Sequence, residues 1–249
     1  MEHVVFVVLC WGLGGFINGI AGFGAALIAM PLITTMVPLR LAVPSCTIIG
    51  VALCLQMAWT YRKHIDFDRL KPVYMGTVPG AFVGITMMQE LPSHYLKLGM
   101  GVFLFIYAMW GLFFEGKKQK VVHKGWGVVA GFCSTAISSS VGMGGPPTIV
   151  YTSLAGWAKD TVKAGIASYF IVSGILIISL QTYAGIQTKE TVLLFACAAP
   201  AVMLGARLGV FASRHIGEFT YRKVLFGMLA LMACMILNSA LAQFSLVTA

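Results

Sequence analysis

The sequence predicts an all-α polytopic membrane protein made of two inverted-topology repeats, each a broken-helix hairpin followed by three transmembrane helices. Three observations lead to this prediction: the apolar composition, the lengths of the uncharged stretches, and a glycine motif that occurs twice. Of the 249 residues, 59% are hydrophobic and 10% are charged, and the mean hydropathy is +0.89. Soluble domains carry about 25% charged residues, so the composition excludes a soluble domain.

Long stretches without Asp, Glu, Lys or Arg follow one another along the whole chain. A helix needs about 20 mostly apolar residues to cross a bilayer. We therefore expect one membrane domain without a soluble part large enough for a second core. The stretches are 3–39, 41–61, 72–89, 98–114, 125–158, 164–188, 191–206 and 224–249.

The stretches 3–39 and 125–158 are too long for one straight helix. Their 37 and 34 residues would extend about 50–55 Å, whereas the hydrocarbon core is about 30 Å thick. We expect each to fold back at its central glycines as two helices of about 15 residues. Because the tips carry no charge, we expect them within the membrane, where such backbone is covered by protein or lines a cavity.

The glycine motif indicates a duplication. Residues 22–25 (GFGA) match residues 142–145 (GMGG) at an offset of 120, and residues 80–84 (GAFVG) match 205–209 (GARLG) at an offset of 125. The second pair is of the GxxxG type, which brings membrane helices into close contact. We therefore expect repeat one over 1–116, a linker over 117–124 and repeat two over 125–249.

The distribution of Lys and Arg favours hairpins that return to the side from which they start. In that arrangement thirteen of these residues lie on one side and three on the other, without Arg207. Fully crossing hairpins, the alternative, give nine against seven, which specifies no orientation. By the positive-inside rule we expect both termini outside. The cytoplasmic loops are then 61–72, 115–124, 156–163 and 213–223.

Returning hairpins give each half an odd number of crossings, so the halves are inverted, as in many secondary transporters. The second arm of each hairpin then begins at a glycine tip with its N-terminus inside the membrane. A helix N-terminus offers free N–H groups and partial positive charge to an anion, and glycine lets the backbone approach a ligand. The predicted substrate-binding residues are Asn18, Gly22, Phe23, Gly24, Ala25, Ser138, Ser139, Ser140, Gly142, Met143, Gly144, Gly145 and Arg207.

The titratable residues argue against other classes of protein. The acidic residues all lie at segment ends or in connections, whereas a cation carrier or proton pump keeps a carboxylate inside the bundle. The histidines also lie outside or at the ends of the segments, which disfavours an intramembrane serine protease. Arg207, which interrupts an apolar segment, either attracts an anion or extends toward the cytoplasmic end.

The sequence indicates no cofactor, metal site or disulfide, because the six cysteines lie in apolar stretches without a CxxC pair. The net charge of +9 comes from basic residues in short connections, which suits lipid headgroups and not nucleic acid. The expected partners are a small anionic substrate and membrane lipid. The oligomeric state stays open, with a homo-oligomer among the alternatives.

Gly15-Phe16 precedes residues 22–24, Gly131-Phe132 precedes residues 142–146, and residues 61–66 read YRKHID. Through these motifs the chain resembles the TauE/SafE sulfite exporter family of bacterial and archaeal anion permeases over nearly its whole length. It implies transport of sulfite, sulfoacetate, sulfolactate or another organic anion across a prokaryotic inner membrane.

We therefore predict a multi-pass secondary transporter, an exporter or permease, for a small sulfur-containing anion such as sulfite or an organosulfonate. The alternatives are an anion channel and a permease for a non-sulfur organic anion. An intramembrane enzyme is less favoured.

Overall fold

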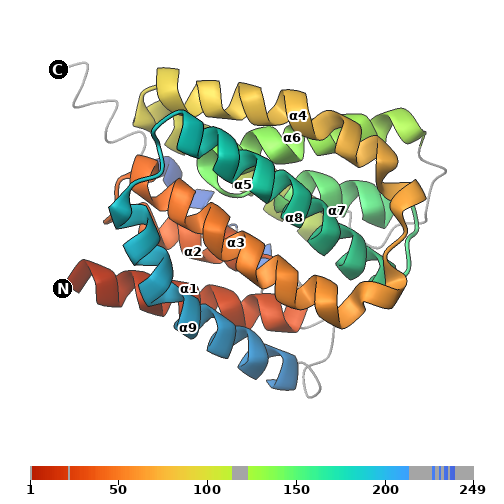
Figure 1. Ribbon diagram of the computed structural model, residues 1–249, viewed down its shortest axis with the longest axis horizontal. Helices are drawn as coiled ribbons and strands as arrows, with labels where there is room; N and C mark the ends of the chain where they lie inside the picture. Colours follow the sequence, from red (N-terminus) through yellow and green to blue (C-terminus); the bar gives the residue numbers. More distant parts are fainter. Residues whose placement is uncertain are drawn as a thin grey trace.

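The computed structural model (Figure 1) describes residues 2–21, 23–113 and 123–212, together with 226, 227, 230, 233, 234 and 236–238. Within these residues every regular element is a helix, which confirms the predicted all-α class. The elements are α1 (Glu2–Ala21), α2 (Ala25–Ile33), α3 (Leu39–Tyr61), the 3-10 turn η1 (Arg62–His64), α4 (Phe67–Glu90), α5 (Ser93–Phe113), α6 (Lys124–Val141), α7 (Gly145–Leu154), α8 (Lys159–Tyr183) and α9 (Lys189–Ala212).

Both overlong stretches break at their glycines, as predicted, but the expected lengths of the arms were wrong. In place of two arms of about 15 residues, α1 and α2 have 20 and 9, and α6 and α7 have 18 and 10. The return arms are short because each stretch also contains the turn into the next helix. In the first hairpin, α2 ends at Ile33, and the turn that follows reaches Pro38, the residue before α3.

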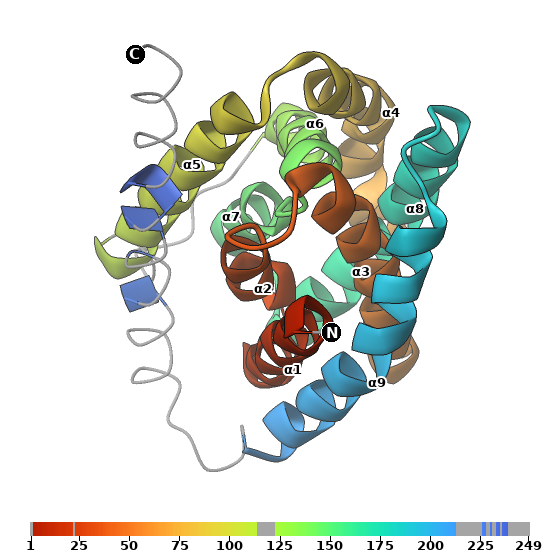
Figure 2. The ribbon, with the colours of Figure 1, turned by 90° about the vertical axis from the view of Figure 1, so that its left-hand side faces the viewer.

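The two hairpins occupy the middle of the molecule, and the longer helices surround them (Figure 2). The return arm α2 is almost completely enclosed, since the exposed fractions of Leu27, Ile28 and Met30 are 2%, 0% and 0%. In α7, Thr148 and Ile149 are also buried. At the second tip Gly142, Met143 and Gly144 are buried, and at the first Phe23 and Gly24 are partly buried and line a cavity, as non-helical backbone inside a membrane requires.

Glycines bring each hairpin into close contact with a helix from the other half of the chain. A Cβ atom at Gly80 in α4 would lie 2.4 Å from the carbonyl oxygen of Phe132 in α6. A Cβ atom at Gly205 in α9 would lie 2.2 Å from the carbonyl oxygen of Gly12 in α1. The prediction that these two GxxxG-type segments serve helix packing is confirmed.

Three described helical segments are long and apolar enough to cross a membrane: Leu39–His64, Asp160–Tyr183 and Lys189–Ala212. The outer face of α9 exposes large apolar side chains, among them Leu204 and Leu208. In a membrane these side chains contact lipid tails.

Candidate functional site

The tip of the first hairpin presents the uncapped N-terminus of α2. Gly24 precedes this helix with φ 96° and ψ 7°, a left-handed conformation, and no side-chain hydrogen bond caps it. The N–H groups of the first helical turn have no acceptor within their own helix. Ala25, Ala26 and Leu27, which carry these groups, line a cavity at the centre of the molecule.

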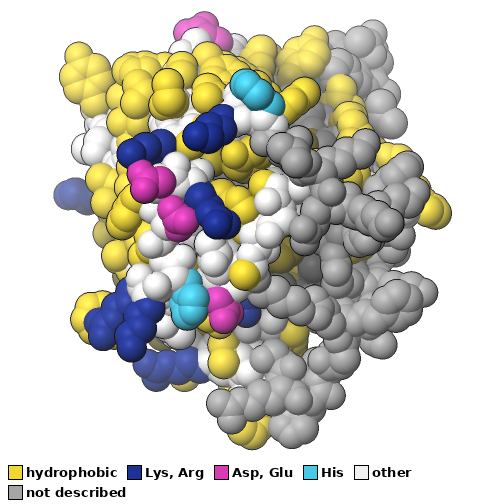
Figure 3. Space-filling model, turned by 90° about the vertical axis from the view of Figure 1, so that its right-hand side faces the viewer, with side chains coloured by type: hydrophobic (Ala, Val, Ile, Leu, Met, Phe, Trp, Pro, Cys, Tyr) yellow, Lys and Arg dark blue, Asp and Glu magenta, His cyan; other side chains and the backbone are white. Residues whose placement is uncertain are grey.

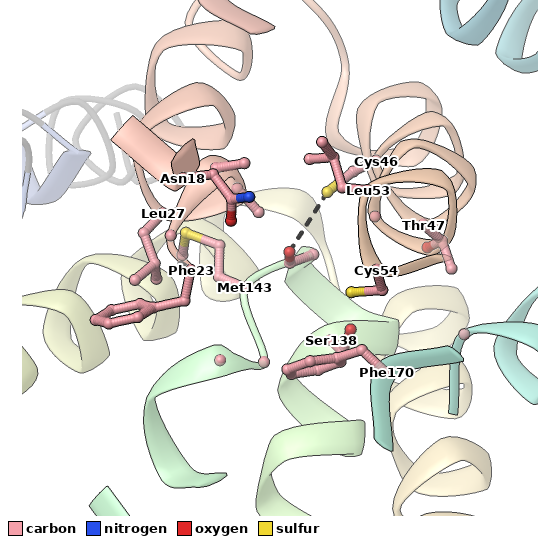
Figure 4. A pocket seen from close by; sticks show the side chains of 18 of the residues that line it. Asn18, Phe23, Leu27, Cys46, Thr47, Leu53, Cys54, Ser138, Met143 and Phe170 are labelled. Atoms are coloured by element: carbon pink, nitrogen blue, oxygen red, sulfur yellow. Dashed lines mark hydrogen bonds between the residues drawn. The ribbon is translucent and has the colours of Figure 1, made fainter. Parts of the chain in front are cut away.

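The tip of the second hairpin faces the same cavity and is tied to its surroundings by hydrogen bonds. Gly142 ends α6 with a φ of 79°, and its N–H donates to the carbonyl oxygen of Ser138 at 3.0 Å. The thiol of Cys46 in α3 donates to the carbonyl of Gly142 at 3.4 Å, the dashed line in Figure 4. The hydroxyl of Ser134 donates to the carbonyl of Gly144.

The cavity between the tips has a volume of about 120 Å³. Besides the hairpins, α3 and α8 form its walls, with Cys54 and Phe170 facing each other across the lower part of Figure 4. Most of the lining is apolar or glycine. The polar side chains that line it are Asn18, Cys46, Thr47, Cys54 and Ser138.

Most of the predicted site residues lie together in this cavity. Those that line it are Asn18, Phe23, Gly24, Ala25, Ser138, Gly142, Met143, Gly144 and Gly145. Gly22 lies outside the described residues. Arg207 lines a neighbouring cavity in place of this one.

Two of the predicted hydroxyls point elsewhere. Ser139 donates to the carbonyl of Thr135 at 2.8 Å, and Ser140 donates to the carbonyl of Ala136 at 2.7 Å. Neither lines the cavity, and Ser139 lies where a side chain at Gly84 would have to be. A serine in a membrane helix often bonds the carbonyl one turn earlier in this way, so among these hydroxyls only Ser138 faces the cavity.

The contributions of α3 and α8 were not predicted. Cys46, Gly50 and Cys54 follow one another at intervals of four on α3, and Phe170 and Gly174 do so on α8. This spacing places each set on one helix face, which was the available signal. It did not identify the site because small and aromatic residues on a membrane helix equally serve packing.

No charged side chain lines the central cavity as the described residues define it. The described acidic residues lie at helix ends. Glu2 begins α1, Asp66 precedes α4, Glu90 ends α4, and the first turns of α4, α8 and α9 contain Asp68, Asp160 and Glu190. A neutral cavity bordered by two helix N-termini attracts an anion more strongly than a cation.

The enclosed hairpins, the membrane-crossing helices and the cavity between the tips define a multi-pass membrane protein with an internal cavity. The profile of the sulfite exporter TauE/SafE family matches residues 7–236. The chain belongs to this family, as the sequence motifs predicted, and membership implies a membrane transporter of the exporter or permease type for sulfite or a related sulfur-containing anion. No curated protein and no solved structure matches the chain.

Proposed function

We propose that this chain is a secondary carrier for a small sulfur-containing oxyanion, such as sulfite or an organosulfonate, and that the central cavity binds it. The observation that carries this proposal is the meeting of the α2 and α7 N-termini at one cavity without an acidic side chain among its described lining. Each helix N-terminus is equivalent to about half a positive charge. Together they stabilise an anion without a fixed cation that would hold it too tightly to be released.

The size and the donors of the cavity support a small anion. An engineered cavity of about 150 Å³ holds a molecule as large as benzene, so about 120 Å³ suits an anion of few heavy atoms. An unpaired ion in an apolar interior is costly, and a helix N-terminus offsets up to about 2 kcal/mol in partly buried geometry. Amides of the first turn of α2 and the side chains of Asn18 and Ser138 are the further donors.

The same proposal includes inverted repeats over 1–116 and 125–249, joined by 117–124. Two arrangements in the structure support it. The first hairpin opens toward the end of the molecule that carries the N-terminus, and the second opens toward the opposite end (Figure 1). In addition, α4 packs on α6 and α9 packs on α1 through equivalent glycines. Transporters with such repeats bind substrate between them near the bilayer midplane.

We further propose that the protein lies in a prokaryotic inner membrane with both termini outside. Figure 3 views the end of the molecule where α3 ends and α8 begins, and Lys and Arg side chains gather there. Basic residues concentrate on the cytoplasmic side of membrane proteins, so this end faces the cytoplasm.

Cysteines at the two ends of α8 test this orientation in a cysteine-free background. We expect Asp160→Cys to react with a membrane-impermeant maleimide only after permeabilisation, and Tyr183→Cys to react in intact cells. Both positions are exposed at opposite ends of the same helix, so each serves as the control for the other. Labelling of Asp160→Cys from outside would refute the orientation.

The transport function is tested by sulfite uptake into proteoliposomes that contain the purified chain. A carrier gives saturable uptake that is accelerated by sulfite on the opposite side, whereas a channel gives no such acceleration. Uptake of a non-sulfur carboxylate without any uptake of sulfite would assign the other substrate class.

Gly24→Val tests the site. Gly24 has a φ of 96°, which a β-branched residue does not adopt without strain, so the first tip must move. We expect sulfite binding to be lost while the protein stays monodisperse. The matched control is Gly99→Ala in α5, where a Cβ atom has open space and which lies away from the cavity. Wild-type affinity in Gly24→Val would show that the anion binds elsewhere.

A further inference from the structure

A second cavity, of about 250 Å³, lies next to the central one and has the positive charge that the central cavity lacks. Lys163 of α8 and Arg207 of α9 line it, and no acidic residue does so among the described residues. Three residues line both cavities, namely Asn18, Leu53 and Met57. The two cavities are therefore neighbours, and these side chains form part of the wall of each.

Neither cation forms an ion pair with a carboxylate among the residues that the structure describes. The ion pairs within the described part of the chain are Arg69 with Asp66 and Lys71 with Asp68, both at the exposed start of α4. Lys163 is held by an aromatic residue instead: its ammonium donates to the hydroxyl of Tyr61 at 3.4 Å and lies 5.3 Å from the centre of that ring. This contact holds the ammonium beside a neutral ring, so no described carboxylate balances its charge.

An unsatisfied amide lies on the wall of the same cavity. The Oε1 atom of Gln56 is buried and has no hydrogen-bond partner. Buried polar atoms without a partner are rare in proteins and call for an explanation. Gln56 also lines the second cavity, and its amide offers both donors and an acceptor to a bound ligand.

We propose that this second cavity is an antechamber that binds the transported oxyanion between Lys163 and Arg207 before it passes Asn18 into the central cavity. The inference rests on the proposed function and names the entry site of the same pathway. Arg and Lys form charge-assisted hydrogen bonds to oxyanions, and Arg does so with two parallel N–H groups. Uncompensated charge in a cleft also raises the local concentration of an anion.

The position of the antechamber fits entry from one end of the molecule. Thr60 and Tyr61 are the last residues of α3, and Lys163 lies in the first turns of α8. These helix ends belong to the basic end in Figure 3, which is cytoplasmic in the proposed orientation. The anion thus meets fixed charges while it is still partly hydrated, and then reaches a neutral site from which release is easier. Conduction pathways need binding that is strong enough for entry and weak enough for exit.

The test measures sulfite transport in proteoliposomes of known orientation, with sulfite supplied first on the side of the basic end and then on the other. We expect Arg207→Gln to raise the half-saturating sulfite concentration on the basic side about tenfold, the effect of losing one hydrogen bond to a charged group. The value on the other side and the maximal rate stay near wild type. Lys163→Gln should behave in the same way, and Arg207→Lys should recover most of the affinity.

Lys63→Gln is the matched control, because Lys63 is an exposed lysine of η1 at the same end and lines neither cavity. It removes the same charge and should leave the half-saturating concentration within about twofold, since surface charges are screened by salt. The Arg207 side chain is exposed, and α9 packs on α1 through Gly205 and Gly209, so its replacement leaves this contact intact.

Equal behaviour of Arg207→Gln, Lys163→Gln and Lys63→Gln would overturn the antechamber while wild-type sulfite transport still upheld the proposed function. An equal loss from both sides would also overturn it, because the two cations would then act on the central site or on stability. Absence of sulfite transport in the wild type itself would overturn the proposed function, and the antechamber with it.

Discussion

The two hairpins share a glycine motif, yet they build their tips in different ways. Among the described residues of the first motif, Gly24, the third residue, has a positive φ and stands directly before α2. In the second motif, the glycine with positive φ is Gly142, the first residue, and it ends α6. The equivalent of Gly24 is Gly144, where a Cβ atom would lie 2.1 Å from the carbonyl oxygen of Ser134. Gly24 is required by its backbone conformation, and Gly144 by the close approach of two arms.

The hairpins also differ in the hydrogen-bond donors that they offer. The first turn of α2 begins Ala25-Ala26-Leu27, with an N–H on every residue, whereas α7 begins Gly145-Pro146-Pro147. Proline has no N–H, so the first turn of α7 has two backbone donors fewer than the first turn of α2.

This difference teaches that an inverted repeat need not give a symmetric site. Both tips contribute the partial charge of a helix N-terminus, but the first supplies most of the backbone donors. The second is the more firmly fixed, through the hydrogen bonds that Ser134 and Cys46 donate to its carbonyls. We expect the second tip to act as a rigid wall and the first as the main hydrogen-bonding surface.

The largest expected effect is on the stability of the second hairpin. Gly144→Ala places a Cβ atom against the Ser134 carbonyl, and we expect a loss of about 3 kcal/mol, the size of severe overpacking. Gly145→Ala is its control, because there the nearest atom is Ile149 Cδ1 at 3.6 Å, an ordinary contact. Thermal unfolding followed by tryptophan fluorescence measures both. Equal melting temperatures for the two variants would contradict the assignment of Gly144 to packing.

The next largest effect is on the packing of each hairpin against its partner helix, α9 for the first hairpin and α4 for the second. Gly80→Ala in α4 brings a Cβ atom against a carbonyl of α6, the first arm of the second hairpin. Gly205→Ala in α9 does the same to α1, the first arm of the first hairpin. We expect each to lose about 2 kcal/mol of stability and to keep measurable sulfite affinity, because neither lines the central cavity. Loss of sulfite binding at wild-type stability would show that these glycines belong to the site.

A smaller effect tests the difference in donors. Ala26→Pro gives the first tip the proline that the second already has at the equivalent position, Pro146, and it removes one N–H. We expect sulfite affinity to fall about tenfold, as for one lost hydrogen bond to a charged group. Ala26→Ser keeps the N–H and serves as the control. If Ala26→Pro binds sulfite like Ala26→Ser in a calorimetric titration, the first tip is not the main donor.

The smallest effect is expected for the carboxylates, since none lies in either hairpin tip. Exchange of Asp66, Asp68, Glu90, Asp160 or Glu190 for the amide should leave proteoliposome transport within about twofold of wild type, because the described acidic residues line neither cavity. Any coupled proton would then travel on the substrate. A folded variant that binds sulfite but no longer responds to a pH gradient would refute this. Glu115 and Glu218, which carry the same prediction, lie outside the described residues.

The carboxylate of Asp68 stays ionised at neutral pH, so we expect neither proton uptake nor proton release by it during transport at that pH. A hydrogen bond from Lys71 and the charge of that lysine hold the pKa of Asp68 below its ordinary value. Its contribution to stability is therefore fully present above the ordinary pKa, and it is lost only as the pH falls through the lowered one. Thermal unfolding of Asp68→Asn and the wild type at neutral and acidic pH measures this small difference.

The sequence by itself determined the membrane class, the helical segments and the positions at which the two overlong segments are interrupted. These follow from local quantities: uncharged length, glycine content and the placement of Lys and Arg. It also located the cavity at the tips, because residues 22–25 and 142–145 interrupt stretches that are too long for one helix.

Only the tertiary structure decided which side chains line that cavity. Cys46, Cys54 and Phe170 reach it because α3 and α8 pack beside the hairpins, and packing partners are not encoded in any local pattern. Ser139 and Ser140 turn away because the carbonyls one turn earlier accept their hydrogen bonds. The side-chain lining of a site depends on which helix faces meet, and these are fixed by contacts between residues that are distant in the sequence.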